Sequence, residues 1–206
     1  MKPSKPFLIS RLSLGLFLLA LLVCSCAPVR PRMPEYPGSV NMFLDASRQK
    51  YDSMKGAFEF TFEKMDGRKV SAEAVTVITP DSVNVRVYRM GLPVGDLESL
   101  SGRKRLDYIV YEEALRKALL WWDFSRYETR RLPDAVLVTG KDTELVLAPR
   151  TYVPVRQTIR VRGADLLISY SDYRPVDGFW YPFGIRIEYR GNTLDLAASE
   201  IELRHN

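Results

Sequence analysis

Residues 183–189 have the sequence FGIRIEY, in which apolar side chains at every second position alternate with glycine, arginine and glutamate. Alternation with a period of two gives a β-strand one buried face and one face in water. Residues 58–62 and 83–87 repeat the pattern, with phenylalanine or valine on the apolar side. Similar runs occur near 69–79, 135–140, 143–149, 154–161, 164–173 and 193–204. The pattern predicts about ten strands, each with one apolar face.

Short turn sequences separate these strands. They are Asp66-Gly67, Pro80-Asp81, Gly140-Lys141-Asp142, Arg162-Gly163 and Gly191-Asn192. Turns this short join antiparallel neighbours, whereas parallel neighbours need a much longer crossover. We therefore predict one large curved antiparallel sheet or barrel, in a mainly β (α+β) domain.

An N-terminal segment has helical periodicity instead. It begins after Ser39, a residue type that favours the N-cap position. Its apolar side contains Val40, Phe43, Leu44, Ser47 and Tyr51. We expect Gly56 to end this helix.

A second helical segment, Tyr111–Trp122, interrupts the strands in the middle of the chain. Its apolar residues recur at spacings of three and four, which form one stripe along a helix. The stripe contains Tyr111, Ala114, Leu115, Ala118, Leu119 and Trp122. We expect this stripe to lie on the concave side of the sheet, where it either completes a solid core or covers a cavity.

The first 26 residues resemble a bacterial lipoprotein signal. Lys2, Lys5 and Arg11 precede an uncharged apolar run at 12–23. This run is shorter than the roughly 20 residues that span a bilayer. Val23-Cys24-Ser25-Cys26 is similar to the lipobox, which implies cleavage before Cys26 and acylation of its sulfur and new α-amine. A plain secretory signal or an uncleaved anchor is the alternative.

Lipidation of Cys26 determines the expected domain organisation. Residues 1–25 are then the signal peptide, 26–38 a proline-rich tether and 39–206 a single domain. Buried acyl chains contribute about 0.8 kcal/mol per CH₂, so membrane lipid would hold the protein through Cys26. Ala27 occupies the position where an aspartate signals inner-membrane retention in enterobacteria. This resemblance favours the bacterial outer membrane, with the domain facing the periplasm.

The net charge and the cysteine content limit the kinds of partner and of covalent cross-link that we expect. The formal charge of +5 falls to +2 when Lys2, Lys5 and Arg11 leave with the signal. A charge this small does not indicate a nucleic-acid partner. Once Cys24 is removed and Cys26 acylated, no thiol remains for a disulfide. The domain must then be stabilised by its apolar core.

The order of elements resembles the LolA/LolB/LppX group of bacterial lipid and lipoprotein carriers. The C-terminal third carries the clearest similarity, over about residues 150–204. The matching segments are TYVPVRQ (151–157), YSDYR (170–174), VDGFWYP (176–182) and IEL (201–203). This resemblance implies an incomplete barrel of about eleven strands, covered by the N-terminal and mid-chain helices.

In that family the space between helices and sheet holds acyl chains. The resemblance implies that the mid-chain helix forms part of a lid, with Leu115, Leu119 and Trp122 facing the cavity. The sheet side would contain Phe58, Phe60, Phe62, Val83, Val85 and Val87. Such a site only needs to remove the CH₂ groups of the acyl chain from water. Ordinary core packing is the alternative for each of these residues.

The segment Met90–Gly95 is apolar where a hairpin tip is usually polar. LolB-type receptors carry a protruding apolar loop at a similar place. Leu92, between Gly91 and Pro93, is the candidate for membrane or partner contact, and we expect its side chain to project instead of pairing in the sheet. Simple packing of Leu92 is the alternative.

The sequence gives little evidence for enzymatic activity. His205, the only histidine, lies next to Asn206 at the C-terminus. The sequence contains no HExxH motif, no Cys/His zinc spacing and no phosphate-binding glycine loop. We expect no catalytic residues, no metal, no cofactor and no enzyme activity.

Two non-enzymatic functions therefore compete. In the first, a LolB-like carrier or receptor binds acyl chains, lipid or lipoprotein cargo in an apolar cavity. In the second, a structural or accessory outer-membrane lipoprotein uses the same fold, with a filled interior, to dock onto an envelope protein partner.

Overall fold

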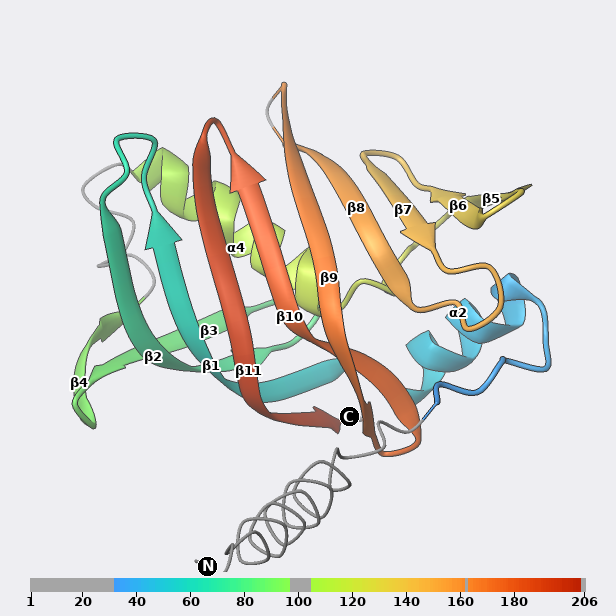
Figure 1. The fold of residues 1–206 in the computed structure, drawn as a ribbon, viewed down its shortest axis with the longest axis horizontal. Coiled ribbons are helices and arrows are strands. Elements are labelled where there is room, and N and C mark those ends of the chain that lie inside the picture. The colour runs from blue at the N-terminus through green and yellow to red at the C-terminus, as the bar shows by residue number, and fades with distance from the viewer. Residues whose placement is uncertain (1–31, 97–104, 162, 205–206) are drawn as a thin grey trace, which may run out of the picture. The chain divides into compact units, whose positions relative to one another are not determined.

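Eleven antiparallel strands form one continuous sheet in the computed structural model, which describes residues 32–96, 105–161 and 163–204 (Figure 1). The strands are β1 (Ser53–Glu63), β2 (Lys69–Ile78), β3 (Val83–Arg89), β4 (Leu92–Asp96), β5 (Glu128–Leu132), β6 (Ala135–Thr139), β7 (Thr143–Leu147), β8 (Pro154–Val161), β9 (Ala164–Val176), β10 (Phe179–Tyr189) and β11 (Asn192–Arg204). The helices are α2 (Val40–Lys50) and α4 (Arg105–Leu119). The signal peptide and Cys26 lie outside the described residues.

The sheet is an incomplete barrel, as predicted. Its strand order is β4-β3-β2-β1-β11-β10-β9-β8-β7-β6-β5, so β4 and β5 form the two edges. Every pair of neighbours is consecutive in the chain except β1 and β11, which pair from Ser53 opposite Arg204 to Glu63 opposite Thr193. Between β4 and β5 the chain forms α4, which therefore connects the two edges and lies across the curved sheet (Figure 1).

Helix α2 begins as predicted but ends earlier. The Ser39 hydroxyl accepts a hydrogen bond from the Met42 amide at 3.3 Å. The helix ends at Lys50, and the Tyr51 amide donates to the Ser47 carbonyl. Gly56 is not the stop, because it is buried inside β1. A Cβ at Gly56 would lie 2.5 Å from the Phe58 ring, so close packing explains the glycine there.

Helix α4 begins before Tyr111 and ends before Trp122. The Leu120 amide still donates to the Arg116 carbonyl, but the Asp123 amide donates to Leu120 in a tighter turn. The Tyr181 hydroxyl donates to the Leu119 carbonyl at 2.7 Å, which satisfies a carbonyl that the helix end leaves unpaired. Trp121 and Trp122 therefore lie in the turn after the helix, although both are buried.

Two edge strands were not predicted. The segment Met90–Gly95 was interpreted as a loop tip, but the turn consists of Met90 and Gly91, and β4 begins at Leu92. Both turn residues have positive φ, 53° and 76°, the combination typical of a two-residue hairpin turn. Strand β5 has the charged sequence ETRRL, in which all but one residue is exposed.

The end of the predicted tether contacts the domain. The Glu35 carboxylate pairs with the Arg150 guanidinium at 2.9 Å, and the Tyr36 amide donates to the Arg150 carbonyl at 3.0 Å. The half-buried Tyr36 ring packs edge-on against Phe43 of α2, with centroids 5.0 Å apart. Residues 35 and 36 are thus attached to the body of the domain.

Candidate functional site

The three residues predicted for the lid side are buried together. Leu115 and Leu119 on α4 have no exposed surface, and Trp122, in the turn that follows, is 1% exposed. All three belong to one hydrophobic cluster with the inner face of the sheet. The helical stripe therefore faces the sheet, as the sequence predicted.

The six predicted sheet residues lie on the inner face. Phe58, Phe60, Val85 and Val87 are buried, while Phe62 and Val83 are half-buried and pack against the same cluster. Strand register explains why they meet. Phe58 lies opposite Ala74 on β2 and Ala198 on β11, and Ala74 lies opposite Val87 on β3.

One end of this inner face is filled by aromatic rings, and we call it the closed end. It comprises Phe43, Tyr51, Trp121, Trp122, Tyr152, Phe179 and Tyr181. Phe43, Trp121 and Phe179 form a triangle of rings, with Phe179 5.8 Å from each of the others and 6.0 Å between Phe43 and Trp121. The Trp122 ring packs edge-on against Phe179 at 5.2 Å. Phe43, Tyr51 and Trp122 were expected on apolar helix faces, but their meeting in one cluster was not predicted, although the runs Trp121-Trp122 and Phe179-Trp180-Tyr181 were a visible signal.

Hydrogen bonds hold the closed end in place. The Trp122 indole donates to the Tyr51 carbonyl at 3.0 Å, and the Tyr181 hydroxyl donates to the Leu119 carbonyl. Burial raises the pKa of the Tyr181 phenol well above the ordinary value of 10.0, so this hydroxyl remains a donor. The C-terminal end of α4 is thus fixed to both α2 and β10.

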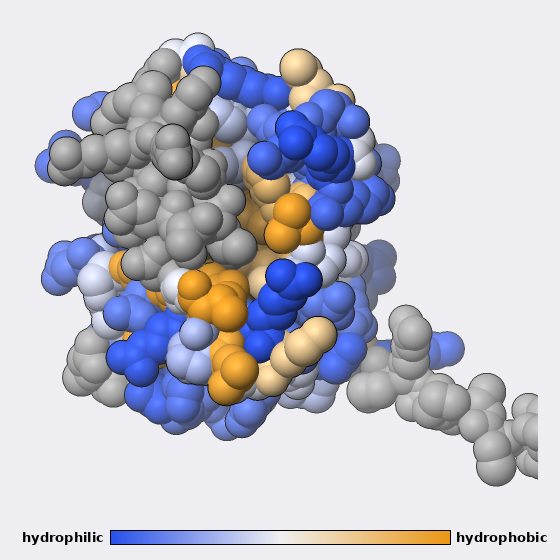
Figure 2. Space-filling model, turned by 90° about the vertical axis from the view of Figure 1, so that its left-hand side faces the viewer, coloured by the Kyte–Doolittle hydropathy of each residue, from blue (hydrophilic) through white to orange (hydrophobic). Residues whose placement is uncertain are grey.

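The opposite end of the inner face, which we call the open end, has smaller and less buried side chains. It comprises Phe62 on β1 and Val70, Ala72 and Ala74 on β2. Val70, opposite Phe62, is 51% exposed, and Ala72 is only half-buried. Figure 2 shows this side of the molecule, with apolar residues exposed among hydrophilic ones.

Exposed large apolar residues are concentrated on the same strands and their hairpins. In this part of the chain they are Met65, Val70, Met90, Leu92 and Val94, whereas the exposed Val77 lies on the outer row near the other end of β2. Scattered exposed apolar residues are normal, but a concentration at one place indicates a binding surface. The inner face of the described domain is thus more exposed at the open end than at the closed end.

A groove of about 780 Å³ lies among the strands of the open end. Its lining residues are 57–59, 71–75, 88–91 and 197–199. Most of them, such as Glu59, Ser71, Glu73 and Ala197, alternate with the inner row and point to the outer face. The groove therefore lies on the outer face of these strands and is not part of the inner face.

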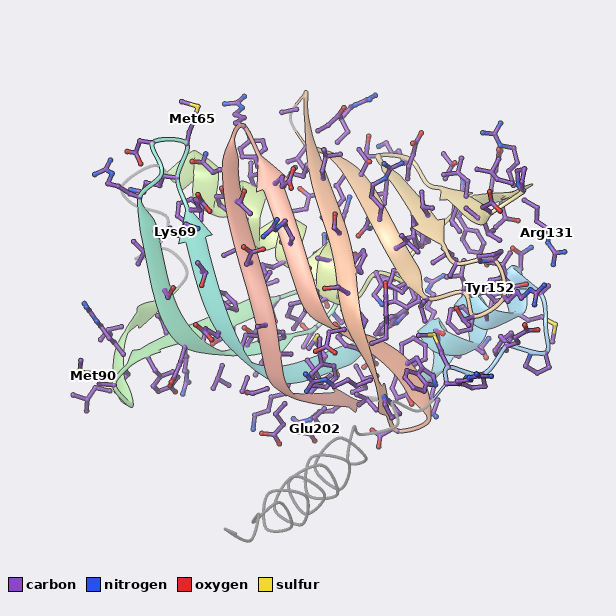
Figure 3. All side chains as sticks on the ribbon, in the orientation of Figure 1. Met65, Lys69, Met90, Arg131, Tyr152 and Glu202 are labelled. Atoms are coloured by element: carbon purple, nitrogen blue, oxygen red, sulfur yellow. The ribbon has the colours of Figure 1, made fainter. Side chains whose placement is uncertain are left out.

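Leu92 is exposed, as predicted, but it is part of the sheet. It is the first residue of β4, it pairs with Arg89, and its exposed fraction is 69%. Met90 is more exposed, at 93%, and Figure 3 shows it at the tip of the β3–β4 hairpin. The expectation that Leu92 would not pair is wrong, because the hairpin turns two residues earlier.

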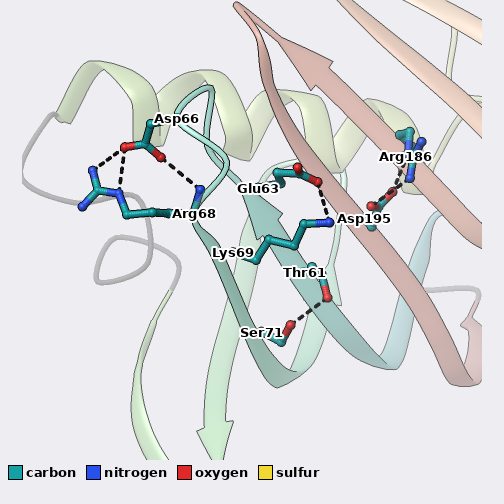
Figure 4. Close-up of polar contacts among 8 residues, drawn as sticks. All are labelled: Thr61, Glu63, Asp66, Arg68, Lys69, Ser71, Arg186 and Asp195. Carbon is teal, nitrogen blue, oxygen red and sulfur yellow. Dashed lines mark hydrogen bonds and ion pairs between the residues drawn. The ribbon is translucent and has the colours of Figure 1, made fainter.

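The outer face of the sheet carries cross-strand polar pairs (Figure 4). Arg186 pairs with Asp195 at 2.6 Å, Lys69 with Glu63 at 3.0 Å, and Thr61 hydrogen-bonds to Ser71 at 2.9 Å. These groups are exposed, and such pairs contribute little stability in water. They keep this face hydrophilic and form no reactive arrangement.

The described residues hold no group of three or more His, Cys, Asp or Glu side chains that could bind a metal ion. Within the same residues, no helix has the length and apolarity needed to cross a membrane.

Comparison with known proteins shows similarity only at the level of structure. No protein-family model matches the chain, and no curated protein matches it. A LolA superfamily protein from Nitrosomonas europaea has a TM-score of 0.48 and 15% identity, over 82% of this chain and 95% of that one. A DUF1329 family protein from Desulfovibrio piger has a TM-score of 0.51 and 13% identity, over 79% of this chain and 89% of that one.

At this identity the second similarity establishes the fold alone. The eleven-stranded open sheet with its two helices is the incomplete barrel covered by two helices that we expected from the sequence.

Proposed function

We propose that this protein is a lipid-anchored, periplasm-facing outer-membrane lipoprotein that binds acyl chains on the inner face of its sheet. In this function it acts as a LolB-like carrier or receptor for lipid or lipoprotein cargo. The cargo enters at the open end, and the closed end holds α4 in place.

The observation that carries this proposal is the change in packing along the inner face. At the closed end, aromatic rings fill the space under α4, and Trp122 is 1% exposed. At the open end, Ala72 and Ala74 occupy corresponding inner positions, and the apolar Val70 is 51% exposed. An acyl chain laid against this surface loses contact with water, which contributes about 0.8 kcal/mol per CH₂.

Two valines on the same strand allow a matched test. Val70 lies on the inner row of β2, opposite Phe62, whereas Val77 lies on the outer row, opposite Lys55. Both are exposed, at 51% and 37%. Val70→Glu should weaken binding of a fluorescent fatty acid at least about tenfold, because it puts a carboxylate against the acyl chain. Val77→Glu should bind like the wild type.

The experiment needs the folded, unlipidated domain and a measurement of stability for each variant. Both substitutions are on the surface, so the free energy of unfolding should change by only about 0.5 kcal/mol. Failure of the wild type to bind any acyl chain would exclude the carrier function. The filled closed end would then favour the alternative, a docking module for an envelope protein.

Lipidation of Cys26 is tested separately. Cys26→Ser should release the protein from membranes into the soluble fraction, and metabolic labelling with palmitate should mark the wild type only. Absence of label on the wild type with its signal intact would rule out the anchor. Binding by the soluble domain would be unaffected by that result.

A further inference from the structure

A second cavity lies at the other end of α4, away from the open end. It has a volume of about 270 Å³ and is lined by the C-terminal turn of α4, residues 120, 121 and 123–126, the β6–β7 turn and Gln157 of β8. None of its lining residues belongs to the acyl-chain site proposed above. It is smaller than the roughly 300 Å³ at which sites for drug-sized ligands begin, so it fits only a small group.

The buried wall of this pocket contains a hydrogen-bond donor without an acceptor. Trp121 is 1% exposed, and among the described residues its indole N–H has no hydrogen-bond partner. The neighbouring Trp122 donates to the Tyr51 carbonyl. A buried N–H that lacks an acceptor is unusual in a folded protein and indicates an unidentified partner.

Gln157 adds a second buried donor. Its side chain lines the pocket and the residue is 2% exposed. The Tyr170 hydroxyl donates to its Oε1 at 2.5 Å, so the carboxamide has its N–H₂ group left to offer. Tyr170 is itself buried within the core cluster, which fixes this orientation.

Cationic side chains surround the opening. Lys117 pairs with Glu113 at 3.2 Å and its Nζ lies 3.5 Å from the Thr143 hydroxyl. Arg126 and Lys141 also line the pocket, are exposed, and form no ion pair within the described part of the chain.

Two acidic residues also line the pocket. The Asp123 carboxylate lies 3.8 Å from the Arg48 guanidinium, which offsets the negative charge of Asp123. The Asp142 carboxylate remains as a negative charge beside the cations of the pocket. The Arg116 guanidinium donates to the Pro80 carbonyl, and Lys117 is paired with Glu113. Within the residues that the structure describes, Arg126 and Lys141 are therefore the two unpaired cations of the lining against Asp142. The pocket thus combines a cationic opening with buried N–H donors, the arrangement that binds an anionic acceptor.

We propose that this pocket binds a phosphate-type oxyanion, supplied either by a lipid headgroup or by free phosphate. A phosphate group has only acceptor oxygens and a negative charge, so it can accept from the Trp121 indole and the Gln157 amide while Arg126 and Lys141 neutralise it. This site is separate from the acyl-chain site, and either can exist without the other.

The three tryptophans of the chain provide a direct readout. In a ¹H–¹⁵N spectrum of the folded domain, the Trp121 indole cross-peak should shift when inorganic phosphate is added at constant ionic strength. The Trp122 cross-peak should stay in place, because its N–H is already bound to Tyr51. No movement of the Trp121 signal with either phosphate or a soluble short-chain phosphatidylglycerol would overturn the proposal.

The two sources are distinguished by these two ligands. A shift with phosphatidylglycerol and with phosphate assigns a headgroup site, and a shift with phosphate alone assigns a free-anion site. Arg126→Ala and Lys141→Ala should each weaken binding by about tenfold, the loss of one charge-assisted hydrogen bond.

Arg130→Ala is the matched control, because Arg130 is exposed and does not line the pocket. Equal weakening by Arg130→Ala would show a general charge effect and would also overturn the proposal.

Discussion

The two ends of the inner face share one alternating strand pattern but differ in side-chain size. At the closed end, Phe43, Trp121 and Phe179 stack within 6.0 Å of one another. At the open end, Ala72 and Ala74 lie opposite Phe60 and Phe58, and the rim is exposed. The difference shows that dense packing and exposed apolar surface occur in separate parts of one sheet. A uniform core would have dense packing throughout.

The largest expected effect comes from removing a ring at the closed end. Trp122→Ala should lower the free energy of unfolding by about 3–5 kcal/mol, because it opens a cavity and leaves the Tyr51 carbonyl unpaired. Phe62→Ala at the open end should cost less than half as much, since Phe62 is already half-buried. Urea denaturation followed by circular dichroism compares the two. Equal losses would mean that the ends do not differ in packing.

The second-largest effect is expected from alkaline pH, which acts on Tyr181 at the closed end and on Tyr170 of β9. Burial raises the pKa of the Tyr170 and Tyr181 phenols well above 10.0. Above that pH the unfolded chain loses these protons while the folded state keeps them, so the free energy of unfolding falls as pH rises. The contribution is fully present below pH 10.

Each of these tyrosines should lower the free energy of unfolding by up to about 1.4 kcal/mol for each pH unit above pH 10. Thermal denaturation from about pH 9 to about pH 12 measures the loss. If the buried tyrosines gave phenolate absorbance before the protein unfolds, the prediction would be wrong. Comparison with Tyr181→Phe measures the contribution of the Tyr181 hydroxyl.

The smallest effect on stability is expected at the open end. Leu92→Glu should change the free energy of unfolding by only about 0.5 kcal/mol, because Leu92 is 69% exposed. It should nonetheless reduce lipid transfer to liposomes, if this hairpin contacts the membrane or a partner. Unchanged transfer would remove the hairpin from the proposed function, and a large loss of stability would show that Leu92 is core.

Local periodicity accounts for most of what the sequence predicted. Strands such as β10 alternate because one face is buried, and the α4 stripe follows from its contact with the sheet. The edge strand β5 was missed because edge strands are often charged and have no apolar face to reveal them. Strand β4 was interpreted as a loop because Pro93 and Gly95 are rare within strands.

The packing of the site could not be predicted because it depends on pairs that are distant in the chain. Leu120, Trp121 and Trp122 continue the apolar stripe, but the Tyr181 hydroxyl binds the Leu119 carbonyl and the helix ends there. Likewise, the pocket beside Trp121 contains Gln157, which no local pattern connects to α4. The difference between the two ends also depends on the register between β1 and β11.

The pairing of β1 with β11 has a consequence for the order in which the domain is made. Strand β1 comes first among the described strands, yet its partner β11 comes last among them, and without β11 the strands β1–β4 do not pair with β5–β10. Non-local pairing of this kind forms slowly, after local hairpins. A nascent chain that still lacks residues 192–204 cannot assemble the complete sheet. Local hairpins can form before that point, and the two halves of the sheet join only after β11 has been synthesised.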